Sequence, residues 1–176
     1  MTFSVAICDD SAPDRAAVQT LLAQWAAQRD LTVAPDIFAS AEQFLFHYED
    51  NPQYDLLLLD IEMCGMDGVT MAKSVRKRNE LVEIVFITGY SDYIAEGYEV
   101  GALHYLVKPL QPEKFFAVLD RAFARRQRNA RCLTLEHGGA LERIALAEIR
   151  YLDVQHNYVT VHAARDYTVK RTLKDM

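Results

Sequence analysis

The sequence predicts a doubly wound α/β domain with a five-stranded parallel sheet, followed by a shorter, incomplete all-β region. Two observations predict the first part. Over residues 1–127, short apolar runs alternate with amphipathic stretches. Most of these runs are continuously apolar, which is typical of strands covered on both faces. A third observation predicts the second part. After an arginine-rich stretch at 125–131, short strand-like runs replace the helical pattern.

The strands of the first region are expected at the apolar runs, which are 4–8, 32–38, 55–59, 83–88 and 104–107. Helices are expected between them, because the intervening apolar residues recur every three or four positions. The first helix is expected around residues 18–25. Ser40 and Gln43 have the spacing of a capping box, which predicts the start of the second helix. Asp67 is the expected N-cap of the third, at 69–78.

A fourth helix is expected at 92–100, and a fifth begins at Pro112. Parallel strands joined by helices require right-handed crossovers. The second region is expected to hold five short strands, at 132–135, 140–145, 149–153, 158–163 and 166–171. Gly138-Gly139 is expected at a hairpin turn, and Thr172 begins the pattern of a helix cap. We predict two domains, 1–127 and 128–176, of which the second is incomplete.

The composition is that of an ordinary globular protein, with 51% hydrophobic and 25% charged residues. No apolar run approaches the roughly 20 residues that span a bilayer. Residues 1–10 lack the basic region of a signal peptide. A cytoplasmic protein without membrane contact is therefore expected. The cysteines, Cys8, Cys64 and Cys132, form no CxxC pair and are expected to be buried thiols.

The net charge of −6 divides into −8 for residues 1–127 and +2 for residues 128–176. An acidic body joined to a mildly basic tail favours two modules with different partners. The tail is not basic enough to establish nucleic-acid binding by charge alone.

Polar side chains stand where the predicted strands end. Asp9 and Asp10 follow the first strand and Asp60 follows the third, while Thr88 ends the fourth and Lys108 follows the fifth. In parallel α/β sheets, ligands bind at the carboxyl ends of the strands, beside the point where the strand order reverses. A single Asp after a strand is more often a helix N-cap than a catalytic group. Five such residues at strand ends favour a functional site.

Three crowded carboxylates repel one another by about 4 kcal/mol per pair at roughly 4 Å and an effective dielectric constant near 20. Either their pKa values rise or a cation joins them. Hard oxygen ligands without His or Cys suit Mg²⁺, which is the expected cofactor. Lys108 adds a positive charge and Thr88 adds a hydroxyl donor. Together these groups favour a carboxylate that accepts a phosphoryl group.

Over residues 3–124 the chain resembles the receiver domain of two-component response regulators, which has a flavodoxin-like fold. The matching motifs are Ile7-Cys8-Asp9-Asp10, Leu58-Leu59-Asp60-Ile61-Glu62-Met63, Gly65-Met66-Asp67-Gly68, Ile87-Thr88-Gly89 and the run from Ala102 to Pro109. One departure is Cys64, which stands where the family often has Pro. The departure affects the loop after the acceptor and leaves the chemistry intact.

The resemblance implies that Asp60 is the phospho-acceptor. It also implies that Asp10 binds Mg²⁺ directly, that Asp9 helps directly or through water, and that the main-chain carbonyl of Glu62 completes the protein ligands. A sensor histidine kinase or a small phosphodonor is the implied source of the phosphoryl group.

By the same resemblance, Thr88 and Lys108 hold the phosphoryl oxygens, and Tyr105 is the aromatic switch that turns inward when Thr88 moves. The surface that reports the change is expected to form a homodimer on activation. Its expected residues are Tyr93, Tyr98, Val100 and Ala102.

Residues 131–176 resemble the first half of a LytTR-type DNA-binding domain. The match rests on the stretch from Arg143 to Asp153, on Asn157-Tyr158-Val159-Thr160-Val161-His162, and on the stretch from Tyr167 to Lys174. The resemblance implies that a complete output domain binds promoter DNA through loops between strands. The candidate DNA contacts are His156, Asn157, Arg165 and Lys170, because Asn pairs with adenine and basic side chains meet phosphates.

The sequence therefore predicts a response regulator that controls transcription and is not an enzyme, beyond slow self-dephosphorylation. One alternative is a receiver that signals through protein contacts without DNA binding. Another is a Mg²⁺-dependent phosphatase of the aspartyl-phosphate type, because Glu62 stands two residues after Asp60, where such an enzyme has its second acid. Against the phosphatase, no cap domain is recognisable and the Asp9-Asp10 pair has no role in it.

Overall fold

The structure is a computed structural model that describes residues 3–89, 100–130, 132–137 and 140–170. The chain forms two compact units, Met1–Phe123 and Ala124–Met176. The division falls inside helix α5 (Pro112–Ala130), a few residues before the boundary expected from the sequence. No helix in these ranges is long and apolar enough to cross a membrane.

The first unit contains the predicted parallel sheet of five strands, in the order β2-β1-β3-β4-β5. The strands are β1 (Val5–Cys8), β2 (Asp36–Phe38), β3 (Leu56–Leu59), β4 (Glu83–Thr88) and β5 (His104–Val107). After β2 the chain crosses to the other side of β1 and continues outward through β3, β4 and β5. The order therefore reverses between β1 and β3, the position at which such sheets bind ligands.

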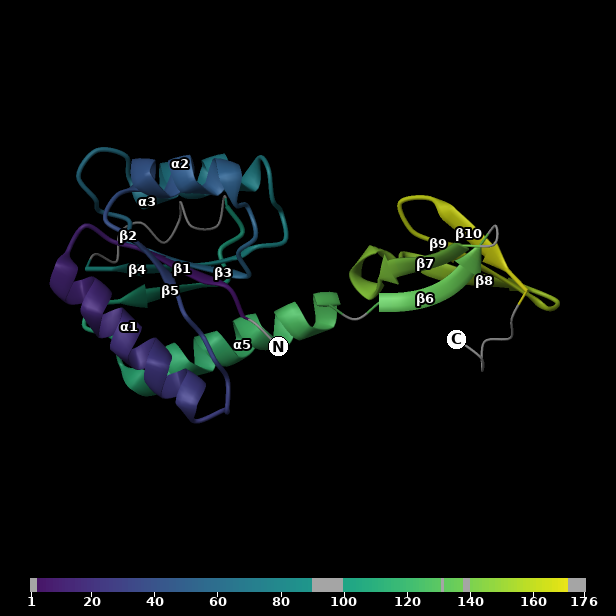
Figure 1. Cartoon of the computed structure of the whole chain (residues 1–176), viewed down its shortest axis with the longest axis horizontal. Coiled ribbons are helices and arrows are strands. Elements are labelled where there is room, and N and C mark those ends of the chain that lie inside the picture. Colours follow the sequence, from purple (N-terminus) through teal and green to yellow (C-terminus); the bar gives the residue numbers. More distant parts are fainter. Residues whose placement is uncertain (1–2, 90–99, 131, 138–139, 171–176) are drawn as a thin grey trace. The chain divides into compact units, whose positions relative to one another are not determined.

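Helices cover both faces of this sheet (Figure 1). Helices α2 (Ala41–Asp50) and α3 (Gly68–Arg76) lie on one face, and α1 (Ala12–Ala27) and α5 lie on the other. Successive residues of β3 enter opposite cores: Leu57 and Leu59 pack toward α2 and α3, whereas Leu56 and Leu58 pack toward α1 and α5. This double burial explains why β1 and β3 are apolar throughout.

The helix starts follow the sequence signals. Ser11 caps α1, and the predicted caps Ser40 and Asp67 accept hydrogen bonds from the main-chain N–H groups three residues later. The Gln43 side chain accepts from the N–H of Ala39, one residue before the N-cap, so the expected capping box is not fully formed. The helix expected at 92–100 lies almost entirely outside the described residues.

Beyond the end of α5, the second unit forms an antiparallel all-β region, as predicted. An antiparallel hairpin of β6 (Cys132–His137) and β7 (Ala140–Ala145) is followed by a short 3-10 helix, Leu146–Glu148. The sheet β10-β9-β8 is formed by β8 (Tyr151–Gln155), β9 (Tyr158–His162) and β10 (Asp166–Val169). A small core joins both sheets and consists of Leu135, Ile144, Val159, Val161, Ala163 and Val169.

Strand β8 begins two residues later than expected, because Leu146–Glu148 forms a helical turn closed by the N–H of Ile149. β8 is an edge strand, and all five of its residues are exposed. The expected turn at Gly138-Gly139 and the helix start at Thr172 lie outside the described residues.

Candidate functional site

The sheet brings the predicted site residues to one edge. The ladder hydrogen bonds continue past the strand ends: the N–H of Asp60 donates to the carbonyl of Cys8 at 2.8 Å, and the N–H of Lys108 donates to the carbonyl of Thr88 at 2.8 Å. The residues that follow β3 and β5 are therefore held beside the ends of β1 and β4. Because the strands are parallel, these ends face the same side of the sheet.

Three carboxylates meet there, as the sequence predicts. One ligand atom from each of Asp9, Asp10 and Asp60 lies within 4.8 Å of the other two. Asp9 and Asp60 are buried, with exposed fractions of 3% and 7%, whereas Asp10 is open to solvent. Two of the three carboxylates are thus held in the protein interior, and the third lies at the surface.

Lys108 supplies a positive charge to this cluster. Its Nζ atom donates hydrogen bonds to Asp60 Oδ2 at 2.7 Å, to Asp9 Oδ2 at 2.8 Å and to Asp14 Oδ2 at 2.7 Å. Asp14, in the first turn of α1, was not recognised from the sequence. The available signal was an acid three residues after the α1 N-cap, where the first helical turn approaches the end of the preceding strand.

The local environment shifts the pKa values in different directions. Burial raises the pKa of the Asp60 carboxyl above its usual range, and the hydrogen bond and charge of Lys108 oppose this shift without reversing it. Burial disfavours the charged form of Lys108, but its hydrogen bonds to Asp14, Asp60 and Asp9 outweigh burial and raise its pKa. The N–H of Cys64 lowers the pKa of Asp10.

The donor set fits a hard divalent cation. All three acidic side chains offer carboxylate oxygens, and the exposure of Asp10 leaves one side open to the waters that Mg²⁺ retains. Burial holds the pKa of Asp60 above its usual range even with Lys108 beside it, so a further positive charge at this site is favourable. A divalent cation held among Asp9, Asp10 and Asp60 would supply that charge. Whether the carbonyl of Glu62 joins them stays a prediction.

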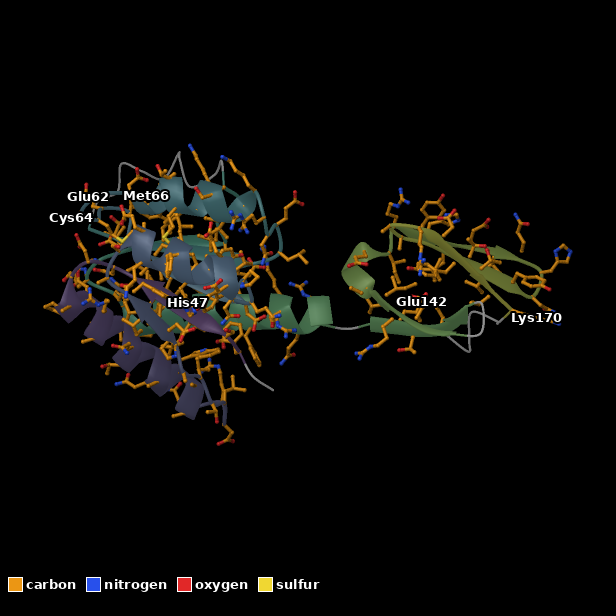
Figure 2. The ribbon with its side chains drawn as sticks, turned by 45° about the horizontal axis from the view of Figure 1, so that its top comes forward. His47, Glu62, Cys64, Met66, Glu142 and Lys170 are labelled. Atoms are coloured by element: carbon orange, nitrogen blue, oxygen red, sulfur yellow. The ribbon has the colours of Figure 1, made fainter. Side chains whose placement is uncertain are left out.

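The loop after β3 is held by two acids from other elements. Asp10 Oδ2 accepts from the N–H of Cys64 at 2.8 Å, and Glu42 Oε1, at the start of α2, accepts from the N–H of Met66 at 2.9 Å. Glu62, Cys64 and Met66 gather at one end of the first unit (Figure 2).

The thiol of Cys64 is exposed, so the expectation of a buried thiol is wrong at this position. Cys8 is buried as expected.

Glycines allow two close approaches in this loop. A Cβ atom on Gly68 would lie 2.0 Å from the main-chain oxygen of Asp60, so only glycine lets α3 begin against the acceptor. Gly65 has a positive φ of 89°, and a Cβ there would lie 2.7 Å from Glu42 Oε1. Gly65 and Gly68 belong to a recognised motif, but no pattern in the sequence indicates these close approaches or the contact of Glu42.

The expected switch residues lie on neighbouring strands. Thr88 is fully buried at the end of β4, and Tyr105 on β5 is partly buried, with its ring centroid 6.3 Å from that of Phe86. Val100 is buried and Ala102 is partly buried, so Val100 offers little surface for the expected dimer contact. Tyr93 and Tyr98 lie outside the described residues.

The structure separates the four candidate DNA contacts. His156 and Asn157 form the exposed turn between β8 and β9, and Lys170 follows β10 at the same end of that sheet, where Val169 pairs with Val159. Arg165 lies in the turn at the opposite end and donates a hydrogen bond to Glu142 at 2.7 Å. Figure 2 shows Lys170 away from Glu142. Arg165 therefore does not lie beside the other three, and DNA contact by any of the four stays a prediction.

Comparisons with known proteins agree with this geometry. A model of the family described as the response regulator receiver domain matches residues 5–120. Sensory transduction protein LytT of Bacillus subtilis is 28% identical over 180 residues, which cover 96% of this chain and 73% of LytT. The response regulatory domain of mrkE from Klebsiella pneumoniae has a TM-score of 0.64 at 24% identity, covering 71% of this chain and 99% of that domain.

The positive alginate biosynthesis regulatory protein of Pseudomonas aeruginosa is 29% identical over 141 residues, covering 71% of this chain. This chain spans 57% of the length of that relative. The fold and the acidic site together define a two-component response regulator. The chain belongs to the response regulator receiver domain family, and the similarity to LytT continues through most of the second unit.

Proposed function

We propose that this response regulator accepts a phosphoryl group on Asp60 in the presence of Mg²⁺ and controls transcription through a LytTR-type DNA-binding output. One observation carries the first half of the proposal. The Asp60 carboxylate lies 2.7 Å from the Lys108 ammonium and belongs to a cluster with Asp9 and Asp10 that suits a divalent cation. Three carboxylates gathered around one ammonium group cost folding stability, which favours a functional over a structural reason for the cluster.

In the transfer, one carboxylate oxygen of Asp60 forms a bond to phosphorus. The bond from phosphorus to the donor breaks, and the donor nitrogen or oxygen keeps the electron pair. The donor is the phosphohistidine of a sensor kinase or a small acyl phosphate or phosphoramidate. Lys108 keeps Asp60 ionised for attack, since its charge opposes the rise of the Asp60 pKa. Bound Mg²⁺ supplies neutralisation of the phosphoryl charge.

The phosphoryl group then changes the local hydrogen bonding. It brings up to two negative charges and three acceptor oxygens to the end of β3. We expect Thr88, at the end of the adjacent β4, to donate its hydroxyl to one of these oxygens and Tyr105 to move into the space that Thr88 leaves. Phosphorylation therefore biases an equilibrium between two arrangements of β4 and β5 and favours a homodimer.

For the output, the turn of His156 and Asn157 with Lys170 offers an amide and a cation at one end of a sheet. These groups match base-edge and phosphate contacts, respectively. The relative LytT also aligns through this region. Arg165 is not included, because it pairs with Glu142 at the other end. The alternative output, docking to protein alone, is favoured by the exposed apolar residues of β8, Leu152 and Val154.

We propose that the protein acts in the cytoplasm and is not a phosphatase of external substrates. The Glu62 side chain, which a phosphatase would use as its second acid, is exposed, and it is the main-chain N–H of Glu62 that contacts Asp60 Oδ1, at 3.3 Å. Turnover of a phosphoester such as p-nitrophenyl phosphate, measured over many cycles, would overturn this statement.

The test of the acceptor uses the full chain with Mg²⁺ and acetyl phosphate or phosphoramidate, followed by intact-mass measurement. We expect a gain of one phosphoryl unit that is lost in Asp60→Asn and unchanged in Asp50→Asn, an exposed control at the end of α2. A gain that persists in Asp60→Asn would remove the assigned acceptor.

The test of the output measures promoter binding by the full regulator, which is expected to weaken steeply as the salt concentration rises. A regulator that binds no DNA at low salt would favour protein contacts alone.

A further inference from the structure

The ammonium group of Lys108 has three N–H donors, and each donates to a different carboxylate. Two of these, on Asp9 and Asp60, belong to the acidic cluster at the strand ends. The third is on Asp14, which comes from the first turn of α1 and lies outside that cluster. The Asp14 side chain is 41% exposed, compared with 4% for Asp9 and 8% for Asp60. Burial therefore does not force Asp14 against Lys108.

The three partners differ in what the proposed reaction does to them. A cation would be coordinated by oxygens of Asp9, and transfer would convert a carboxylate oxygen of Asp60 into part of an acyl phosphate. Both changes weaken the hydrogen bonds that these residues accept from Lys108. Asp14 is neither a candidate cation ligand nor the acceptor, so neither event competes for its hydrogen bond to Lys108.

We propose that Asp14 is a positioning residue for Lys108, and this inference rests on the proposed function. Asp14 anchors the ammonium to the start of α1 while cation and phosphoryl group bind. The two remaining N–H donors are thereby directed toward the strand ends, where the phosphoryl oxygens arrive. Without Asp14, the long Lys108 side chain regains rotamers that point into water, and the site loses a preorganised donor.

The test compares Asp14→Asn with the wild-type full chain. We expect phosphorylation by acetyl phosphate to slow about tenfold, and beryllofluoride to bind about tenfold more weakly, since a hydrogen bond between charged groups is lost. The Mg²⁺ dissociation constant is expected to change by less than about twofold. Asp14 does not bind the ion, and solvent screens the charge of its half-exposed side chain. Asp14→Glu restores much of the rate. Glu113→Gln, in the exposed first turn of α5, is the control and has no effect.

A double-mutant cycle separates positioning from a general charge effect. In a Lys108→Ala background, Asp14→Asn is expected to cause no further change, because the residue acts through Lys108. An equal effect of Asp14→Asn with and without Lys108 would overturn the proposal, as would wild-type rates in Asp14→Asn or a parallel loss of Mg²⁺ affinity.

A readout without phosphorylation distinguishes this proposal from the proposed function. In lysine-selective ¹⁵N NMR of the Mg²⁺-loaded chain, the Lys108 ammonium is expected to exchange slowly with solvent in the wild type and rapidly in Asp14→Asn. Slow exchange lost in the variant, together with no phosphoryl uptake by the wild type, would refute the proposed function alone. Unchanged exchange in Asp14→Asn would refute the positioning role alone.

Discussion

The Oδ2 atom of Asp60 and the Nζ atom of Lys108 lie 2.7 Å apart, although 48 residues separate them in the chain. The contact exists because β3 and β5 end on the same side of the sheet, with β4 between them. It joins a carboxylate whose pKa is raised by burial to the cation that opposes this shift. The same pair is the centre of the proposed phosphoryl chemistry. The burial of the charged Asp60 carboxylate, which costs folding stability, therefore occurs at the residue that is proposed to react.

Mg²⁺ is expected to stabilise the protein by binding the folded state. At a free concentration about one hundred times the dissociation constant, the free energy of unfolding rises by about 2.7 kcal/mol. Asp10→Asn removes the exposed ligand and is expected to lose most of this increase. Thermal unfolding across a Mg²⁺ titration measures it. Asp30→Asn, an exposed acid beyond α1, is the control, and an Asp10→Asn curve that matches the wild-type curve would contradict the assignment.

The stability of the metal-free protein is expected to fall as the pH rises through the folded-state pKa of Asp60. Burial raises that pKa above the unfolded value of about 3.9. The folded state therefore binds the proton more tightly, and the favourable contribution is complete below the unfolded pKa and lost above the folded one.

In Asp60→Asn this contribution is absent, so the variant gains stability relative to the wild type as the pH rises from about 4 toward neutrality. Denaturant unfolding in the presence of a chelator, at a series of pH values, measures the difference. A difference between the two proteins that is constant over this range would contradict the burial of an ionised Asp60.

Gly68→Ala is expected to destabilise the first unit by about 3 kcal/mol and to slow phosphorylation. A methyl group at this position meets the main-chain oxygen of Asp60 at 2.0 Å, and backbone atoms on both sides must move. Gly89→Ala is the matched control, because a Cβ there meets nothing within 4 Å. Chemical denaturation and acetyl phosphate labelling measure both effects. Equal stabilities of the two variants would show that the loop is looser than described.

In the complete regulator, Asn157→Ala is expected to weaken specific promoter binding by about 1–3 kcal/mol, since a base contact is lost. Lys170→Ala is expected to weaken binding to all sequences and to reduce the salt dependence by about one phosphate contact. Arg165→Ala serves as the control at the opposite end of the sheet. Titration of specific and unrelated DNA at several salt concentrations separates these outcomes. Equal losses for Arg165→Ala and Asn157→Ala would contradict the assigned binding end.

The sequence predicted the elements whose signals are local. The apolar runs of β3, β4 and β5 and the caps Ser40 and Asp67 can be recognised without tertiary information, and so can the strand-end positions of Asp60 and Lys108. β2 was predicted too long, because its extent depends on the short stretch of β1 that it pairs with, Ala6–Cys8.

The remaining differences depend on contacts between distant residues. Asp14 joins the site only because the first turn of α1 lies beside the loop that follows β5. The exposure of Cys64 follows from the path of a loop held by Asp10 and Glu42. Arg165 was grouped with Lys170 by nearness in sequence, whereas the antiparallel sheet places them at opposite ends. Only Asp14 carried a local signal, its place three residues after the α1 N-cap, and that signal does not identify its partner.

The most direct measurement of the central claim locates the covalent product. Chain treated with Mg²⁺ and acetyl phosphate is reduced with borohydride, which converts an aspartyl phosphate into homoserine, and the peptides are sequenced by mass spectrometry. We expect homoserine at position 60, with none at positions 9, 10 or 14. Reduction product at one of those other positions, or no product in a chain that has gained phosphoryl mass, would contradict it.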